Sequence, residues 1–160
     1  MLNLLLSLLA IPFVLLLLLI LFVLITIAVH IVRDWTFRRR FRAKWSPAGK
    51  FVLFVYSNSP NWQSYIENTI LPEISPVAVT LNWSERKRLE EEASLEFRAF
   101  RFWAGEREFN PVAIVVPPAG RVKVVRFWKA FRDYKHGKPH ALHAAERRLR
   151  ALIEQCRLRP

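Results

Sequence analysis

The chain has 160 residues, of which 25 are Lys or Arg and 13 are Asp or Glu, so its formal net charge is +12 at pH 7. Its single cysteine, Cys156, excludes an intramolecular disulfide, a CxxC redox centre and a cysteine-rich zinc site. The positive charge favours anionic surfaces as partners, and the charged part of the chain has the length of one folded domain.

The first 32 residues contain no Lys, Arg, Asp or Glu. A helix needs roughly 20 apolar residues to cross the hydrocarbon core of a bilayer, so residues 1–32 predict a transmembrane helix. A cleaved signal peptide is the alternative. The uncharged N-terminus, the length of the apolar run and the arginine-rich sequence after it all argue against cleavage.

A basic and aromatic segment, residues 33–49, follows and is predicted to be a juxtamembrane linker that ends in a Ser-Pro-Ala-Gly break. The positive-inside rule places this side in the cytoplasm and the N-terminus outside, as in a single-pass protein of the cell membrane. Aromatic rings suit headgroup depth, and cations attract the anionic inner leaflet. The residues predicted at this membrane interface are Arg33, Trp35, Arg38, Arg39, Arg40, Arg42 and Lys44.

The predicted folded domain, residues 50–160, begins with a strand and a helix. The apolar run at residues 51–56 has the length and β-rich composition of a buried strand. Ser59 is a suitable N-cap and Pro60 suits the first helical position, which predicts a helix from there to Pro72.

A second strand is predicted at residues 77–81, and a longer helix should run from its cap, Ser84, to Gly105. One apolar stripe is expected along that helix. The stripe consists of Leu89, Ala93, Phe97, Phe100 and Ala104.

Two further strands, residues 112–116 and 121–127, flank a short Pro-Pro-Ala-Gly turn and should pair as an antiparallel hairpin. Alternation in the second of them places Val122 and Val124 on one face. Residues 128–137 suit either a strand extension or a helical turn.

A last helix is predicted to start at Pro139, with Leu142, Ala145, Leu149, Leu152 and Cys156 on its apolar face. The resulting order, β-α-β-α-β-β-α, predicts an α/β fold. A right-handed crossover makes the first two strands parallel neighbours, and the hairpin completes a mixed four-stranded sheet in a three-layer domain.

This order, with Pro111 before the third strand, resembles the thioredoxin-like superfamily and glutaredoxins in particular. The stretch from Tyr56 to Trp62 looks like the family's Tyr-x-x-x-Cys-Pro-x-Cys approach, with Ser59 and Trp62 at the two cysteine positions. The resemblance implies a cis bond before Pro111, although most X-Pro bonds are trans. Without the cysteines, thiol–disulfide exchange is lost.

The resemblance also implies a groove at the start of the first helix, able to hold an anion or an extended peptide. The residues predicted to line it are Asn58, Ser59, Asn61, Trp62, Asn82 and Pro111. In the simpler alternative, Ser59 is only an N-cap and Pro111 only introduces a strand. Trp83, Trp103 and Trp128 are candidates for a hydrophobic wall around the Asn58–Trp62 loop.

Three functions follow as hypotheses. The first is a redox-inactive thioredoxin-like domain, anchored at the cytoplasmic membrane face, that binds a protein or peptide partner. The second is a glutathione-dependent enzyme using Ser59, because the related glutathione transferases use a Ser or Tyr hydroxyl there; however, Pro117 and Pro118 replace their Glu/Gln-Ser pair. The third is a membrane-tethered nucleic-acid binder, suggested by the aromatic and cationic residues 127–135.

No cofactor and no metal are predicted. His136, His140 and His143 have spacings that could place ligands on one helical face, but Gly137 and Pro139 interrupt a common helix. We therefore expect these histidines to be solvated at a helix start.

Overall fold

The computed structural model describes residues 2–105 and 109–158 of the chain. It divides into two compact units, Met1–Phe37 and Arg38–Pro160, which are described separately.

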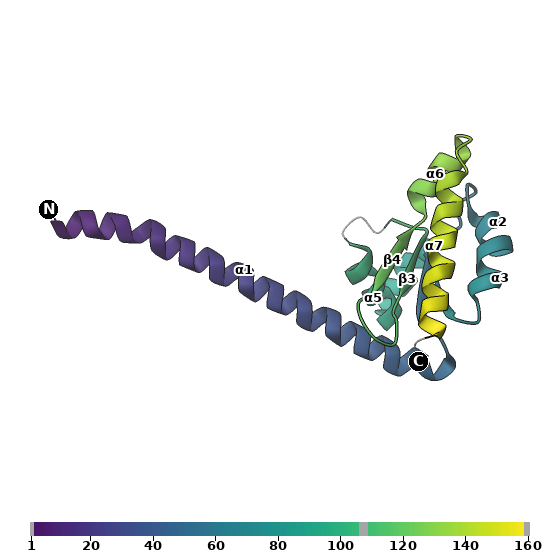
Figure 1. The fold of residues 1–160 in the computed structure, drawn as a ribbon, viewed down its shortest axis with the longest axis horizontal. Coiled ribbons are helices and arrows are strands. Elements are labelled where there is room, and N and C mark those ends of the chain that lie inside the picture. The colour runs from purple at the N-terminus through teal and green to yellow at the C-terminus, as the bar shows by residue number, and fades with distance from the viewer. Residues whose placement is uncertain (1, 106–108, 159–160) are drawn as a thin grey trace. The chain divides into compact units, whose positions relative to one another are not determined.

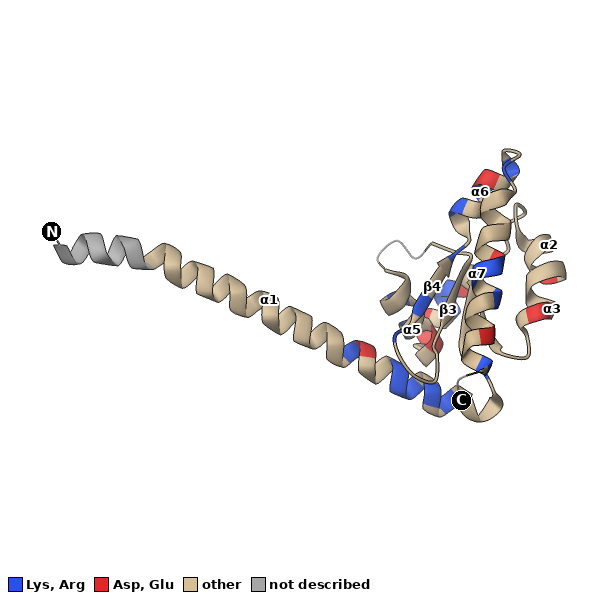
Figure 2. Ribbon diagram, viewed as in Figure 1, with Lys and Arg blue, Asp and Glu red and all other residues tan. Residues whose placement is uncertain are grey.

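Helix α1 (Leu2–Trp45) accounts for the whole first unit. Its side chains from residue 11 to residue 33 are all exposed, although most of them are apolar. By length and composition, this helix can serve as a membrane anchor or as a signal sequence. Figure 2 shows the Lys and Arg residues of α1 gathered in its C-terminal part.

The second unit has the predicted order of strands and helices. After the last turns of α1 and a short 3-10 helix, η1 (Ser46–Ala48), the elements are β1 (Val52–Tyr56), α2 (Gln63–Tyr65), the π-helical η2 (Ile66–Ile70), α3 (Leu71–Ile74), β2 (Ala78–Asn82), the 3-10 helix η3 (Trp83–Glu85), α4 (Arg86–Glu92), α5 (Leu95–Ala104), β3 (Val112–Val115), β4 (Lys123–Arg126), α6 (Trp128–Lys135) and α7 (His140–Arg157). The α/β class and the order β-α-β-α-β-β-α are confirmed.

The four strands form one mixed sheet in the order β2-β1-β3-β4. Strand β1 is parallel to β2, with Val52 opposite Ala78, and antiparallel to β3. Strands β3 and β4 form the expected antiparallel hairpin. A mixed sheet in this order with helices on its faces is compatible with a thioredoxin-like fold.

Helices cover both faces of the sheet (Figure 1). On one face, Phe54 of β1 and Val125 of β4 join a continuous core with residues of η2, α3, α6 and α7. On the other face, helix α5 contacts β1 and β3. Burial of the strands on both faces explains why β1 reads as an unbroken apolar run.

Two predictions of helix ends were wrong. The first helix does not end at Pro72, because this residue lies in the first turn of α3, where its missing N–H needs no partner. The long helix predicted after β2 is two helices, with Ala93 in a left-handed conformation between them (φ 44°). Ser94 caps the second by accepting a hydrogen bond from Phe97 N at 3.2 Å.

Strand β4 is shorter than the strand predicted at residues 121–127, and Val122 lies before it. Val122 and Val124 are only half-buried, whereas Val125 and Phe127 are buried in the core. The ambiguous stretch after β4 is helical. Helix α7 buries Leu142, Leu149 and Cys156 as predicted, and also Ile153 and Glu146.

The C-terminal end of α1 packs as part of the second unit, where the sequence predicted a linker. Phe41 is fully buried and meets Trp103 of α5 edge-on, with 6.2 Å between ring centroids. Glu96 of α5 lies 2.8 Å from Lys44 Nζ and accepts a hydrogen bond from Trp45 Nε1 at 2.5 Å. These contacts join residues 41–45 to α5.

We expect Glu96→Ala to lower the free energy of unfolding by about 1–3 kcal/mol, because it removes the acceptor of a half-buried indole N–H. Burial alone raises the pKa of Glu96, but hydrogen bonds from Lys44, from its own backbone and from Trp45 outweigh burial and lower it. The stabilisation by the charged form is therefore present above the ordinary pKa of 4.5 and is lost as the pH falls through the lower folded value.

Denaturant unfolding of the full chain in detergent, measured between neutral pH and pH 3, checks this expectation. Glu96→Gln should remove the Glu96 part of the acid dependence. The exposed Glu91 of α4 is the matched control, and Glu91→Ala should change neither stability nor pH profile. An unchanged unfolding curve for Glu96→Ala would contradict the role of this contact.

Candidate functional site

Polar side chains cluster where β1 and β2 end. These parallel strands finish side by side, with Tyr56 opposite Asn82. Asn82 Nδ2 donates to Asn58 Oδ1 at 2.8 Å, and the backbone N–H of Asn58 donates to Ser84 Oγ at 2.8 Å. Asn82 Oδ1 also accepts from the backbone N–H of Ser84 at 3.0 Å. The structure thus brings Asn58 and Asn82 together, their side chains bind each other, and the Asn82 side chain caps η3.

Ser59 begins the turn that leads into α2. Its carbonyl oxygen accepts hydrogen bonds from the backbone N–H groups of Trp62 and Gln63 at 3.1 and 2.9 Å. Its hydroxyl accepts two long hydrogen bonds from Asn61, one from the backbone N–H at 3.4 Å and one from Nδ2 at 3.5 Å. Helix α2 begins only at Gln63, with Trp62 as its N-cap residue and no side-chain cap, so Ser59 lies in the turn before the helix and not at the predicted N-cap position.

Pro111 lies at the same edge of the sheet. The peptide bond between Asn110 and Pro111 is cis, as the resemblance implied. The next residue, Val112, pairs with Val55, which places Pro111 opposite Tyr56 in the antiparallel register. Pro111 is buried, and its carbonyl oxygen accepts from the backbone N–H of Phe127 at 2.9 Å. This bond joins the Pro111 turn to the start of α6.

A groove of about 230 Å³ lies between the start of α2 and helix α6. Its aromatic residues are Trp62, Trp128 and Phe131, and its polar residues are Asn61, Arg132, Lys135 and His136. Lys135 Nζ donates to Asn61 Oδ1 at 3.1 Å, which joins the two sides. Of the predicted site residues, Asn61 and Trp62 line this groove, while Asn58 and Asn82 belong to the neighbouring polar cluster.

The aromatic rings of the groove support one another. Phe109 stacks on Trp128 with 4.8 Å between ring centroids, and the Arg132 guanidinium lies over the same ring at 5.0 Å. Trp62 packs against Phe131 at 6.1 Å. Trp62 Nε1 is buried, and it has no acceptor among the residues that the structure describes. A buried indole N–H without a hydrogen-bond acceptor is uncommon in folded proteins.

Tyr65, behind the groove, is held by helix α7. Its hydroxyl donates to Glu146 Oε1 at 2.6 Å, and its ring meets Phe131 edge-on. Burial, and next the hydrogen bond to Glu146, raises the pKa of Tyr65 to about 12, so the phenol stays protonated at neutral pH. Tyr65 therefore links α7 to the aromatic residues of the groove.

The groove contains neither a thiol nor a metal cluster. Residues 59 and 62 carry no sulfur, and Cys156 is buried on α7, where burial raises the pKa of its thiol. Within the described ranges, no three His, Cys, Asp or Glu side chains are placed to hold a metal ion. These residues provide aromatic surface, amide groups and positive charge, which suit binding.

Comparison with protein-family models, curated proteins and solved structures found no match to the chain. The site is therefore interpreted from its own geometry.

The predicted tryptophan wall was only partly correct. Trp83 packs on Phe97 and Phe100, and Trp103 packs on Phe41, so of the three only Trp128 lines the groove. Of the groove residues from 128 to 136, the sequence predicted Trp128 but did not place Phe131, Arg132, Lys135 and His136 at the Asn58–Trp62 loop. Their signal was the mixture of aromatic and cationic residues at 127–135, which folds over the start of α2.

The predicted membrane-interface residues fall into two groups. Arg33, Trp35, Arg39 and Arg40 are exposed. Arg38 and Arg42 donate to the carbonyl oxygen of Gly120 at 2.9 and 3.4 Å, and Lys44 pairs with Glu96. Contact of these residues with lipid stays a prediction.

Proposed function

We propose that residues 38–160 form a redox-inactive, thioredoxin-like binding module that α1 anchors at the cytoplasmic face of the cell membrane. The exposed apolar surface of α1 and the arginines after it support the anchor and its orientation. The absence of cysteines at residues 59 and 62 supports a role without disulfide exchange.

The observation that carries the proposal is the groove between α2 and α6. It combines aromatic walls with Arg132 and Lys135, and among the residues that the structure describes no carboxylate lines it. Aromatic and arginine residues are those most often found at the energetic centre of protein interfaces. Such a surface complements an extended acidic segment of a protein partner, because opposite charge steers association and an apolar wall adds affinity.

The stacking around Trp128 favours a peptide over a nucleic acid. Phe109 and the Arg132 guanidinium both lie over the Trp128 ring, which leaves little of that ring open for a base. A binder of single strands instead presents open aromatic faces along a basic track.

We expect the full chain, purified in a neutral detergent, to bind acidic peptides from a peptide array more tightly than basic ones. The double variant Arg132→Glu with Lys135→Glu should weaken binding at least about tenfold, because it replaces attraction at the groove by repulsion. Fluorescence polarisation with the best acidic peptide from the array measures the effect.

The matched control replaces the exposed Arg147 and Arg148 of α7 by glutamate, an equal change of charge outside the groove. Equal losses in both double variants would contradict a specific groove. Tight, steeply salt-dependent binding of single-stranded oligonucleotides would favour the nucleic-acid hypothesis instead. Reporter fusions at the C-terminus test orientation, and an external signal would overturn the cytoplasmic placement.

A further inference from the structure

A second, larger pocket lies at the opposite end of β3 from the groove. Its volume is about 400 Å³, within the range of small-molecule sites. The turn between β3 and β4 forms one side of it, and the last turns of α7 form the other. The residues that line it on α7 are Leu152, Gln155 and Cys156, and those on the hairpin are Val115, Pro117, Pro118, Ala119, Gly120, Arg121 and Lys123.

The pocket has an apolar interior and a positively charged opening. Val115 and Cys156 are buried in its wall and, with Leu152 and the prolines, form an apolar interior. Arg121 and Lys123 are exposed and supply positive charge, and within the described part of the chain no Asp or Glu lines the pocket. A ligand that fits must therefore be amphipathic, with an anionic group beside an apolar part.

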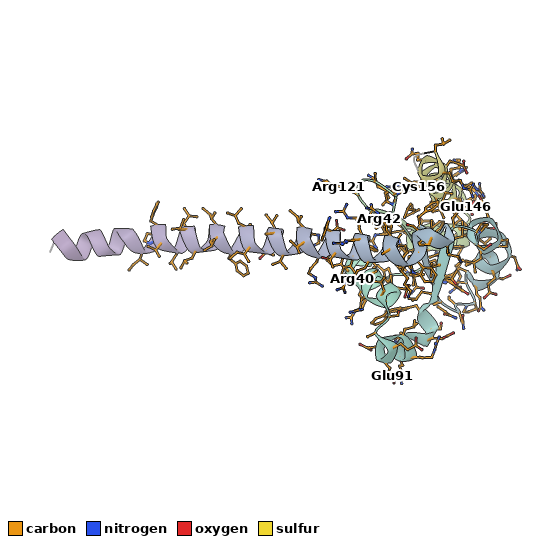
Figure 3. All side chains as sticks on the ribbon, turned by 90° about the horizontal axis from the view of Figure 1, so that it is seen from below. Arg40, Arg42, Glu91, Arg121, Glu146 and Cys156 are labelled. Carbon is orange, nitrogen blue, oxygen red and sulfur yellow. The ribbon has the colours of Figure 1, made fainter. Side chains whose placement is uncertain are left out.

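Two more cations lie against the same turn. Arg38 and Arg42, on the last turns of α1, both donate to the carbonyl oxygen of Gly120. Figure 3 labels Arg42, Arg121 and Cys156, which lie on the side of this unit away from Glu91. The turn thus carries positive charge from α1 as well as from β4.

Arg38, which donates to this turn, follows the apolar run closely in the sequence. Arg38 is only six residues from Val32, the last residue of the uncharged run. A segment of that length spans at most about 20 Å even when fully extended. If α1 crosses a membrane, the pocket cannot be far from its surface, whatever the placement of the two units.

We infer that this pocket binds one anionic phospholipid of the membrane to which α1 anchors the chain. Arg121 and Lys123 receive the headgroup phosphate, and the apolar interior takes the glycerol and the first part of an acyl chain. Anionic headgroups are recognised by such basic pockets beside membrane segments. This inference rests on the proposed membrane placement and is independent of the peptide groove.

The test uses the full chain in nanodiscs of equal parts phosphatidylglycerol and phosphatidylcholine. After release, native mass spectrometry counts the lipids that stay bound. We expect phosphatidylglycerol to be retained over phosphatidylcholine by about tenfold or more, and Arg121→Glu with Lys123→Glu to abolish this preference. Leu152→Trp, which fills the pocket without a change of charge, should also reduce retention.

Controls separate this inference from its alternatives. Arg147→Glu with Arg148→Glu should retain the lipid, and an equal loss in this variant would show general surface attraction and overturn the inference. Displacement of the lipid by inorganic phosphate would identify a free anion as the ligand and overturn it as well.

The groove variant Arg132→Glu with Lys135→Glu should keep the lipid and lose only the acidic peptide. Lipid loss in the pocket variant with peptide binding intact supports this inference even if the peptide groove fails its own test. A chain that does not incorporate into nanodiscs contradicts the proposed anchor and overturns the inference with it.

Discussion

Phe41→Ala is expected to lower the free energy of unfolding of the α/β domain by about 3–5 kcal/mol, the usual loss for a buried phenylalanine. Phe41 is fully buried and packs against Trp103 of α5. The substitution leaves a cavity that the surrounding helix and sheet can close only in part. Denaturant unfolding of the full chain in detergent, followed by tryptophan fluorescence, measures the change.

The matched control is Trp35→Ala, another large aromatic residue on the same helix. Its side chain is 53% exposed, so a change within about 1 kcal/mol is expected. Equal and small effects of the two substitutions would contradict the packing of Phe41. They would support the predicted linker, in which residues 33–49 only connect the apolar helix to the domain.

Phe127→Ala is expected to destabilise the domain by a similar amount, about 3–5 kcal/mol. Phe127 follows β4, is fully buried, and meets Phe54 with 6.0 Å between ring centroids. It also begins the turn into α6, where Phe131 N donates to its carbonyl oxygen at 2.8 Å. Loss of the ring should therefore also loosen α6 and weaken binding of the acidic peptide at the groove.

Val122→Ala is the comparison for Phe127→Ala, at the residue just before β4. Val122 is only half-buried, so this substitution should cost about 1 kcal/mol or less. Thermal unfolding compares the stability of Phe127→Ala and Val122→Ala. Binding of the acidic peptide is then measured at a temperature at which both variants are folded. A larger loss of stability from Val122→Ala than from Phe127→Ala would contradict the burial of Phe127 in the core.

The order of the elements was predictable because its signals are local. The apolar run at residues 51–56, the Pro-Pro-Ala-Gly turn and the apolar period of α7 each lie within one segment. The helix break at Ala93 was missed because the apolar stripe continues across it, and only the left-handed turn with the Ser94 cap divides the stripe. To choose between one long helix and two shorter ones, the elements on which each helix packs must be known.

The candidate site was predictable only where it depends on local sequence signals. The cluster of Asn58 and Asn82 could be expected, since both follow parallel strands that end at one edge. The contribution of α6 could not, because Lys135 meets Asn61 across 74 positions of sequence. The pairing depends on how α6 folds over the start of α2.

By itself, the sequence determined the uncharged N-terminal run, the basic segment after it, the single cysteine and the order of strands and helices. These are properties of composition and short-range periodicity. Only the tertiary structure decided that Phe41 belongs to the core, that Val125 and Phe127 are buried, and that Trp128, unlike Trp83 and Trp103, joins Trp62 at the groove. Each of these depends on contacts between distant segments, whose burial is settled only when the chain packs.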